Sequence, residues 1–486
     1  MNKEIRVLEP KNIWNKFADL NAVPRPSKHE ERVIAFMMDF GKSLGLETTK
    51  DAVGNVIIKK PASVGMEDRK SVILQSHLDM VHQKNADTDF DFSTQGIEMY
   101  VNGDWVRAKG TTLGADNGLG VATIMALLES KDIPHPPLEA LFTIDEETGM
   151  TGAKGLKGGM LKGDILLNLD TEDDDEIDIG CAGGIDITAK GVYGEIPLGD
   201  GFAAYKIEVK GLSGGHSGMD IHLGLGNANK IMNDLLIVGH KQLGLRISKI
   251  DGGGLRNAIP RESTALVAIK ASDAKELDAL FKDWINTIKK EFVATEPNLK
   301  IVCEPSPPPK MVMETKDQLA LTAAIKNALN GVYAMSKTMK DLVETSNNIA
   351  RVEVGEGQIK IACLTRSSVE AGKMELAKDL QSTFEKAGYE VTLSGDYPGW
   401  NPNPDSDILE LLRAKYKELF NEQPRVVACH AGLECGILGK NYPDVDMISF
   451  GPTIKGAHSP DERASISSLQ KFWKFILEIL ADIPKK

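Results

Sequence analysis

The feature that most constrains the fold is an alternation of short apolar runs with helical segments over the first 186 residues. SVILQSHLD (71–79), LEALFTIDEE (138–147) and DILLNLDTED (164–173) are apolar runs that end in polar residues. GLGVATIMALLES (118–130), between the first two, has the uniform apolarity of a buried helix. Strands that alternate with helices predict an α/β fold with a mostly parallel sheet and helices on both faces.

The pattern changes at about residue 187 and returns to its first style at about residue 398. FAAYKIEVKGLSGG (202–215) reads as a strand followed by a glycine-rich turn, and a similar order of strands and helices recurs after the proline-rich stretch 304–310. We take that stretch as a connector between two α+β units. The chain therefore predicts a discontinuous catalytic domain, residues 1–186 and 398–486, and an inserted α+β lid domain of one or two units, residues 187–397.

The segment SKHE (27–30) precedes the helical run ERVIAFMMDFGKSLGL (31–46). Ser27 and Glu30 have the spacing of a capping box, in which each side chain bonds the other residue's amide. We therefore expect these two residues to close the first turn of that helix.

Composition restricts the class of protein. The 486 residues carry a net charge of −13, which disfavours nucleic acid and anionic membranes as partners. No apolar run reaches the ~18 residues of a membrane span, and the first residues lack the apolar stretch of a secretory signal. The five cysteines form no CxxC pair, so neither a disulfide framework nor a cysteine zinc site is expected. A cytoplasmic location is the resulting expectation.

Histidine and acidic residues stand where the predicted strands end. In chain order these are His77 and Asp79, Asp116 in a glycine-rich turn before the buried helix, Asp145–Glu147, Asp170, and His458 after the strand VDMISFG (445–451). Ligands of open α/β sheets bind beyond the carboxyl ends of strands, so these segments can converge there. Imidazole and carboxylate suit zinc, and also manganese or cobalt.

Each of these residues alone is a weak signal. A single histidine is more often a surface residue than a ligand, and a strand-end aspartate is more often a turn residue. The acidic run TEDDDEID (171–178) is more simply a solvated loop than part of a site. The hypothesis of a metal site therefore depends on the assembly and on the strings around it.

These strings resemble the aminoacylase, carboxypeptidase and dipeptidase family of two-zinc peptidases, over essentially the whole chain. The matching motifs, in family order, are HLDMV (77–81), GTTLGADNG (110–118), DEETGMTGA (145–153), GGHSG (214–218), RNAIP (256–260) and GAHSPDE (456–462). One small departure is Val81-His82, where valine and proline are expected.

The resemblance implies the following metal ligands. His77 and Asp170 bind one zinc, Glu147 and His458 bind the other, and Asp116 bridges both. Asp79 follows His77 by two residues, so it lies on the same side of an extended segment and can orient the imidazole. Glu146 is the implied general base, because adjacent carboxylates diverge and Glu147 can bind metal while Glu146 faces the water.

In the lid domain, the resemblance implies three substrate contacts. His216 of GGHSG stabilises the oxyanion, while Asn257 of RNAIP and Arg366 of LTRSS (364–368) contact the substrate. Arg366 has the geometry to pair with a C-terminal carboxylate. The turn GLECG, which starts at Gly432, could add backbone amides to the same carboxylate. A turn histidine and a structural arginine are the simpler interpretations.

The resulting prediction is a metal-dependent peptidase with two zinc ions per chain that acts on unblocked dipeptides. Within the family, an N-acyl amino acid deacylase or a carboxypeptidase would have the same zinc chemistry and a different pocket. A non-catalytic binding protein is the alternative of another class, and the complete set of implied ligands argues against it. The family resemblance also implies a homodimer.

Overall fold

The computed structural model describes residues 2–486, which divide into two compact units. The first comprises residues 2–180, 400–428 and 433–486, and the second comprises residues 181–399 and 429–432. The predicted boundaries were 186 and 397. The division falls earlier at the first boundary because β9 (Gly183–Val192) pairs with strands of the second unit along its length.

The first unit contains an eight-stranded mixed sheet. Its strands, in spatial order, are β1 (Glu47–Lys50), β2 (Val56–Lys60), β6 (Leu138–Thr143), β3 (Val72–His77), β7 (Ile165–Asn168), β23 (Asp446–Ser449), β8 (Glu176–Cys181) and β22 (Arg425–Cys429). The four central strands, β6-β3-β7-β23, are parallel, and β1, β2 and β8 pair antiparallel at the flanks. The α/β class is thus confirmed, with the parallel part confined to the centre.

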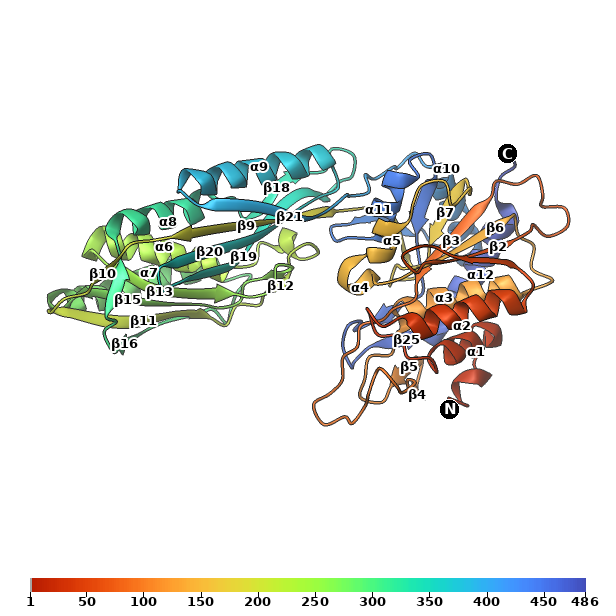
Figure 1. Ribbon diagram of the computed structural model, residues 1–486, viewed down its shortest axis with the longest axis horizontal. Helices are drawn as coiled ribbons and strands as arrows, with labels where there is room; N and C mark the ends of the chain where they lie inside the picture. Colours follow the sequence, from red (N-terminus) through yellow and green to blue (C-terminus); the bar gives the residue numbers. More distant parts are fainter. Residues whose placement is uncertain (1) are drawn as a thin grey trace. The chain divides into compact units, whose positions relative to one another are not determined.

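Helices cover both faces of the first sheet. The helices are α1 (Lys11–Leu20), α2 (Glu31–Ser43), α3 (Ala115–Glu129), α4 (Glu146–Gly149), α5 (Thr151–Gly155), α10 (Asp407–Phe420), α11 (Glu434–Asn441) and α12 (Ile466–Asp482). The crossover from β3 to β6 contains α3, and the crossover from β6 to β7 contains α5 and runs in the opposite direction. Right-handed crossovers of opposite direction place their helices on opposite faces. Accordingly, α1 packs on α3 and α11 packs on α5, on either side of the sheet (Figure 1).

A small four-stranded sheet lies beside this core. It consists of β24 (Ile454–Lys455), β25 (Arg463–Ser465), β5 (Trp105–Ala108) and β4 (Met99–Asn102). Because β24 and β25 flank the loop 456–462, this sheet fixes the segment that carries His458.

The second unit contains one antiparallel sheet of nine strands. Along its path lie β16 (Lys300–Ser306), β11 (Phe202–Lys210), β15 (Ser263–Lys270), β13 (Arg246–Gly253), β19 (Val343–Gly355), β20 (Gln358–Ser367), β9 and β21 (Glu390–Tyr397), and β18 (Gly331–Met335) pairs with β19. Two short pairs accompany it, β10 (Glu195–Pro197) with β17 (Met311–Met313) and β12 (Gly215–His216) with β14 (Ala258–Ile259).

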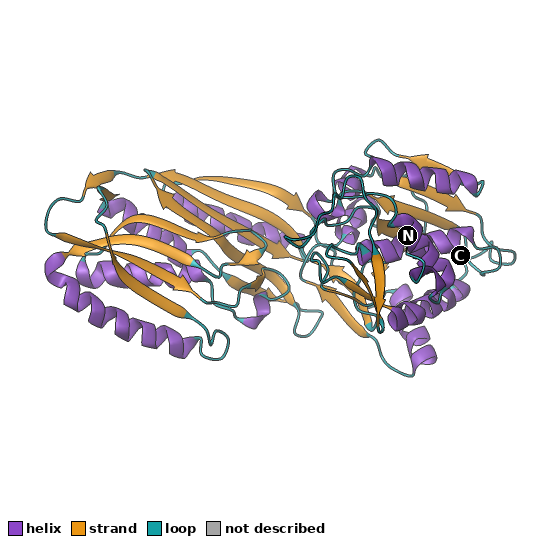
Figure 2. Cartoon of the chain, turned by 90° about the horizontal axis from the view of Figure 1, so that it is seen from below, coloured by secondary structure: helices purple, strands orange, loops and turns teal. Residues whose placement is uncertain are grey.

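Two βαββαβ arrangements share this sheet. The first is β11-α6-β13-β15-α7-β16 and the second is β9-α8-β19-β20-α9-β21, with antiparallel pairing of β13 and β19 where they meet. Their helices are α6 (Ala228–Leu243), α7 (Ala274–Glu291), α8 (Thr315–Asn327) and α9 (Glu370–Lys386), and Figure 2 shows these helices together on one face. A single apolar core lies between that helical layer and the sheet.

The proline-rich stretch 304–310 is only partly a connector. Residues 304–306 form the end of β16, and Pro305 lies opposite Tyr205 at the edge of the sheet. Proline is tolerated there because an edge strand leaves one row of amides unpaired.

No helix in residues 2–486 combines the length and apolarity that a membrane crossing requires.

Candidate active site

The five implied metal ligands of the first unit converge at the carboxyl ends of its parallel strands. His77 ends β3, Glu147 lies in α4 just after β6, and Asp170 follows β7. Asp116 lies in the first turn of α3, and His458 lies in the loop between β24 and β25. Asp116 and His458, which are 342 positions apart in the chain, therefore come into contact at one edge of the sheet.

These residues form two clusters that share Asp116. In the first, His77 Nε2 lies 3.2 Å from Asp116 Oδ1 and 3.5 Å from Asp170 Oδ1. In the second, His458 Nε2 lies 3.2 Å from Asp116 Oδ2 and 2.9 Å from Glu147 Oε2. Because each oxygen of Asp116 faces a different histidine, its carboxylate can serve two cations at once.

The donor set fits divalent cations. In each cluster the ligand atoms lie within 4.8 Å of one another, and each offers one imidazole nitrogen and two carboxylates. Glu147 Oε1 is buried and has no hydrogen-bond partner among residues 2–486, although buried polar atoms normally find one. A cation bound by nitrogen and oxygen, such as zinc, would satisfy that oxygen.

Strong electrostatic coupling marks the second cluster. The carboxylates of Asp116 and Glu147 raise the pKa of His458 to about 11. Burial alone would raise the pKa of Asp116, but the hydrogen bonds from His458 and His77 outweigh it and hold that pKa well below its usual range. The negative potential that stabilises the His458 imidazolium would equally attract a metal cation.

Asp79 connects one ligand to another. Its Oδ1 lies 3.3 Å from His77 Nδ1 and accepts the Glu146 amide at 3.0 Å, while its Oδ2 accepts the Glu147 amide at 3.3 Å. The Ser27 hydroxyl donates to Oδ2 at 2.8 Å. One buried carboxylate thus orients the imidazole and the start of α4 together.

The capping-box prediction for Ser27 and Glu30 is wrong. Glu30 precedes α2 without any side-chain cap, and it accepts the Lys28 amide instead. The Ser27 hydroxyl instead donates to Asp79, because a buried carboxylate needs hydrogen-bond donors.

Glu146, the implied base, lies beside the ligands at the start of α4. One carboxylate oxygen of Glu146 lies within 4.8 Å of a ring nitrogen of His77 and of a carboxylate oxygen of Glu147. Burial raises the pKa of Glu146 well above its ordinary value; the His77 imidazole opposes this rise, and Asp170 and Glu147 reinforce it. A carboxyl in this environment is suited to carry a proton.

Two positioning residues were missed by the sequence analysis. The oxygens of Glu462 accept the four consecutive amides of residues 113–116 at 2.6–3.2 Å, which holds the turn that presents Asp116. The buried guanidinium of Arg25 donates to the carbonyls of Leu78, Asp79 and Gly114. Glu462 stands inside the GAHSPDE motif, but nothing in its spacing reveals its partners.

In the second unit, the structure brings His216 and Arg366 together. His216 Nε2 lies 3.4 Å from Arg366 Nη2, and His216 Nδ1 accepts the amides of Gly218 and Met219. Since Nδ1 is an acceptor, a neutral His216 carries its proton on Nε2. The guanidinium of Arg366 is buried, and its other side-chain partners within residues 2–486 are the hydroxyls of Ser217 and Tyr397, not a carboxylate. A buried guanidinium that hydrogen bonds hydroxyls can also bind an anionic ligand.

The other two predicted substrate contacts have less defined surroundings. Asn257 is exposed, and its carbonyl accepts the Ser217 amide at 2.8 Å. Gly432 ends the segment 429–432, which packs with the second unit. The sequence analysis missed His430 of this segment, which is buried beside Ser346; burial, with the nearby Arg366 and His216, lowers its pKa to about 3.

The family comparison agrees with this geometry. Residues 73–482 match the model of peptidase family M20/M25/M40. The chain belongs to this family. It is therefore a peptide-bond hydrolase of the metallopeptidase type.

Two relatives of this M20-family chain match along its full length. The cytosol non-specific dipeptidase of Escherichia coli is 43% identical over 483 residues, which cover 99% of this chain and 100% of the relative. The solved aminoacylhistidine dipeptidase of Vibrio alginolyticus has 44% identity and a TM-score of 0.92, covering 100% of this chain and 99% of its own. A tripeptidase of Staphylococcus aureus shares the fold, with 16% identity, a TM-score of 0.57, and coverage of 98% of this chain and 99% of its own.

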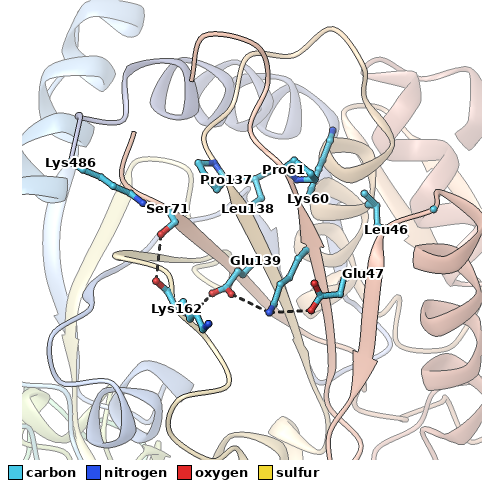
Figure 3. Close-up of a pocket in the computed structure, with 12 residues that line it drawn as sticks. Leu46, Glu47, Lys60, Pro61, Ser71, Pro137, Leu138, Glu139, Lys162 and Lys486 are labelled. Carbon is cyan, nitrogen blue, oxygen red and sulfur yellow. Dashed lines mark hydrogen bonds and ion pairs between the residues drawn. The ribbon is translucent and has the colours of Figure 1, made fainter. Parts of the chain in front are cut away.

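The cavity in Figure 3 is separate from the metal-ligand cluster of this M20 peptidase. It has a volume of about 540 Å³ and is lined by Ser71, Leu138 and Lys60 among others. Ser71 precedes β3 and Leu138 begins β6, so the cavity lies at the amino ends of these parallel strands. The cluster lies at their carboxyl ends, where open α/β sheets bind their ligands.

Proposed function

We propose that this M20 peptidase hydrolyses unblocked dipeptides, including Xaa-His dipeptides such as carnosine. The observation that carries this proposal is the pair of ligand clusters that share Asp116, with Glu146 beside them. The names of the two full-length relatives support the dipeptide substrate.

We assign the metal ligands as the sequence predicted. His77, Asp116 and Asp170 would hold one zinc ion, and Asp116, Glu147 and His458 would hold the other, with manganese or cobalt as substitutes. When bound, the two ions polarise the peptide carbonyl and acidify a water molecule.

Glu146 is the proton carrier in this proposal. It takes a proton from the attacking water and delivers it to the departing amine. The raised pKa of Glu146, caused first by burial, favours retention of that proton until the amine leaves. Asp79 supports this step because it binds the Glu146 amide while it orients His77.

Residues of the second unit would recognise the substrate. We assign the oxyanion to His216, whose Nε2–H is directed by the two amides on Nδ1. We assign recognition of the C-terminal carboxylate to Arg366, which is buried, donates to the hydroxyls of Ser217 and Tyr397, and lies beside the His216 ring. Asn257 and the turn at Gly432 would add polar contacts to the same substrate.

Metal analysis combined with a substrate panel tests the proposal. We expect two metal ions per chain and turnover of carnosine and other free dipeptides. Cleavage of an N-acyl amino acid by the two-metal protein, with no turnover of any dipeptide, would instead support the deacylase alternative.

We further propose a homodimer, which the family resemblance supports, and a cytoplasmic location, which the name of the Escherichia coli relative supports. Mixing inactive Glu146→Gln chains with inactive His216→Ala chains tests which subunit supplies His216. Recovered activity means that the histidine crosses between subunits, because one site of the heterodimer then has both groups. No recovery, in dimers shown to have exchanged, places His216 in the site of its own chain.

A further inference from the structure

A buried row of polar side chains crosses the central strands of the first unit. The row runs from Glu434 of α11 through Gln75 of β3, Asn168 of β7 and Ser449 of β23 to Thr171, and it ends at Asp178 of β8. All six residues are buried, and each is hydrogen bonded to the next. We call this set the polar row.

The polar row lies directly beneath two metal ligands. Gln75 is opposite Asn168, Asn168 is opposite Ser449, and Ser449 is opposite Asp178 in the strand register. Gln75 and His77 lie two apart in β3 and therefore share a face of the sheet, and Asp170 follows two residues after Asn168, the last residue of β7. The polar row is therefore connected to these two ligands through short stretches of backbone, two residues long in each case.

The two amides of the row set the direction of its hydrogen bonds. Gln75 Nε2 donates to Glu434 Oε2 at 2.6 Å, and Asn168 Nδ2 donates to Gln75 Oε1. Asn168 Oδ1 must then accept, so the single hydroxyl proton of Ser449 is used there.

Counting protons decides the other end of the row. Thr171 Oγ1 lies 2.8 Å from both Ser449 Oγ and Asp178 Oδ2. Since the Ser449 proton is already used, the one proton of Thr171 is needed for the contact with Ser449. If Thr171 donated to Asp178 instead, the 2.8 Å contact between the Thr171 and Ser449 oxygens would contain no proton. Both contacts are hydrogen bonds only if Asp178 itself donates.

The surroundings of Asp178 favour the protonated form. Burial, reinforced by the nearby Glu176 carboxylate and by Asp170, raises the pKa of Asp178 to about 8, while Thr171 and Arg425 act against this rise. Asp178 Oδ1 has no hydrogen-bond partner among residues 2–486. An ionised carboxylate with one bare oxygen would be costly at this depth.

We propose that Asp178 is a protonated carboxylic acid in the folded protein at neutral pH, and that Asp178 and Glu434 are positioning residues for His77 and Asp170. They hold the polar row at its two ends, and the row holds the strand ends that carry the ligands. Gln75 and Asn168 cannot pass a proton along the row as hydroxyls do, so its role is to position and not to conduct. The positioning role rests on the proposed metal site, whereas the protonation of Asp178 does not.

Infrared spectroscopy and thermal unfolding test the protonation directly. We expect a carbonyl band of a protonated carboxylic acid in the wild type at neutral pH that is missing in Asp178→Asn. The folded state binds this proton more tightly than the unfolded state, so the stabilisation is full at low pH and is lost as pH rises through about 8. The Tm of the wild type minus the Tm of Asp178→Asn should therefore decrease as the pH is raised from about 5 to about 9. No such band, or a relative Tm that is flat or rises with pH, would overturn the protonation.

Zinc titration tests the positioning role without an activity measurement. Ser449→Ala cuts the polar row at its middle, and we expect Zn²⁺ affinity to fall by about 10-fold or more, as with other partners that orient ligands. Ser76→Ala is the matched control, because Ser76 is buried on β3 and its Oγ has no partner among the described residues. Equal Zn²⁺ affinity of Ser449→Ala and Ser76→Ala would overturn the positioning role. If neither the wild type nor any variant binds Zn²⁺, the proposed metal site fails, and the infrared result on Asp178 still stands.

Discussion

Replacement of Asp79 by asparagine tests the link between the imidazole and the start of α4. The carboxylate accepts four donors, two on each oxygen, and asparagine replaces one oxygen with an NH₂ group. The asparagine side chain is best accommodated with its NH₂ group in the place of Oδ2. The Ser27 hydroxyl can then turn and accept from this group, and only the Glu147 amide loses its acceptor. One lost hydrogen bond to a charged group costs about 1.5–3 kcal/mol. At about 1.4 kcal/mol per tenfold, we expect a loss of about 10–100-fold in metal affinity and in kcat/KM.

Asp104→Asn is the matched control for this experiment. Asp104 also binds hydroxyls and an amide, those of Ser465 and Ser467 at the start of α12, but it contacts no implied ligand. The Asp104→Asn substitution should lower the Tm and leave zinc affinity and kcat/KM near the wild-type values. A folded Asp79→Asn protein with unchanged zinc affinity and unchanged kcat/KM would refute the reasoning.

Three further substitutions separate the roles of the remaining residues. Glu146→Gln should retain both metals and lower kcat by about 10²-fold or more, since it removes the base and no ligand; near-native turnover at full metal occupancy would contradict the assignment. Asp116→Ala should lower occupancy at both metal positions in metal analysis, and loss of a single ion per chain would make Asp116 an ordinary ligand. The wild type should prefer a free dipeptide over its C-terminal amide, and Arg366→Ala should abolish that preference; an equal preference in the wild type would remove Arg366 from the carboxylate site.

Local patterns were sufficient to predict the α/β class and the strand ends at which the candidate ligands stand. Apolar runs that end in His77 or Asp170 predict strands with functional ends, because alternation and burial are properties of a few consecutive residues. Family motifs then supplied the implied ligand set, and the structure brings all five of its members together.

The partners of individual side chains were not predictable in the same way. Ser27 has the spacing of a helix cap and instead binds Asp79, 52 residues away. Glu462 binds the amides of residues 113–116 across nearly 350 positions, with no local signal. A buried donor or acceptor takes whichever partner packing brings near, and that choice is made between segments and not within them.

The sequence by itself thus determined which residues could do chemistry and at which strand ends they stand. The tertiary structure alone decided that each oxygen of Asp116 faces a different histidine, and that Asp79 joins His77 to α4. It also decided that the side chains of Gln75 and Asn168, which look like ordinary strand residues, hydrogen bond each other in the polar row next to the ligands. The physical reason is that periodicity is encoded over a few residues, whereas hydrogen-bond partners depend on strand order and register, which arise only when the whole sheet assembles.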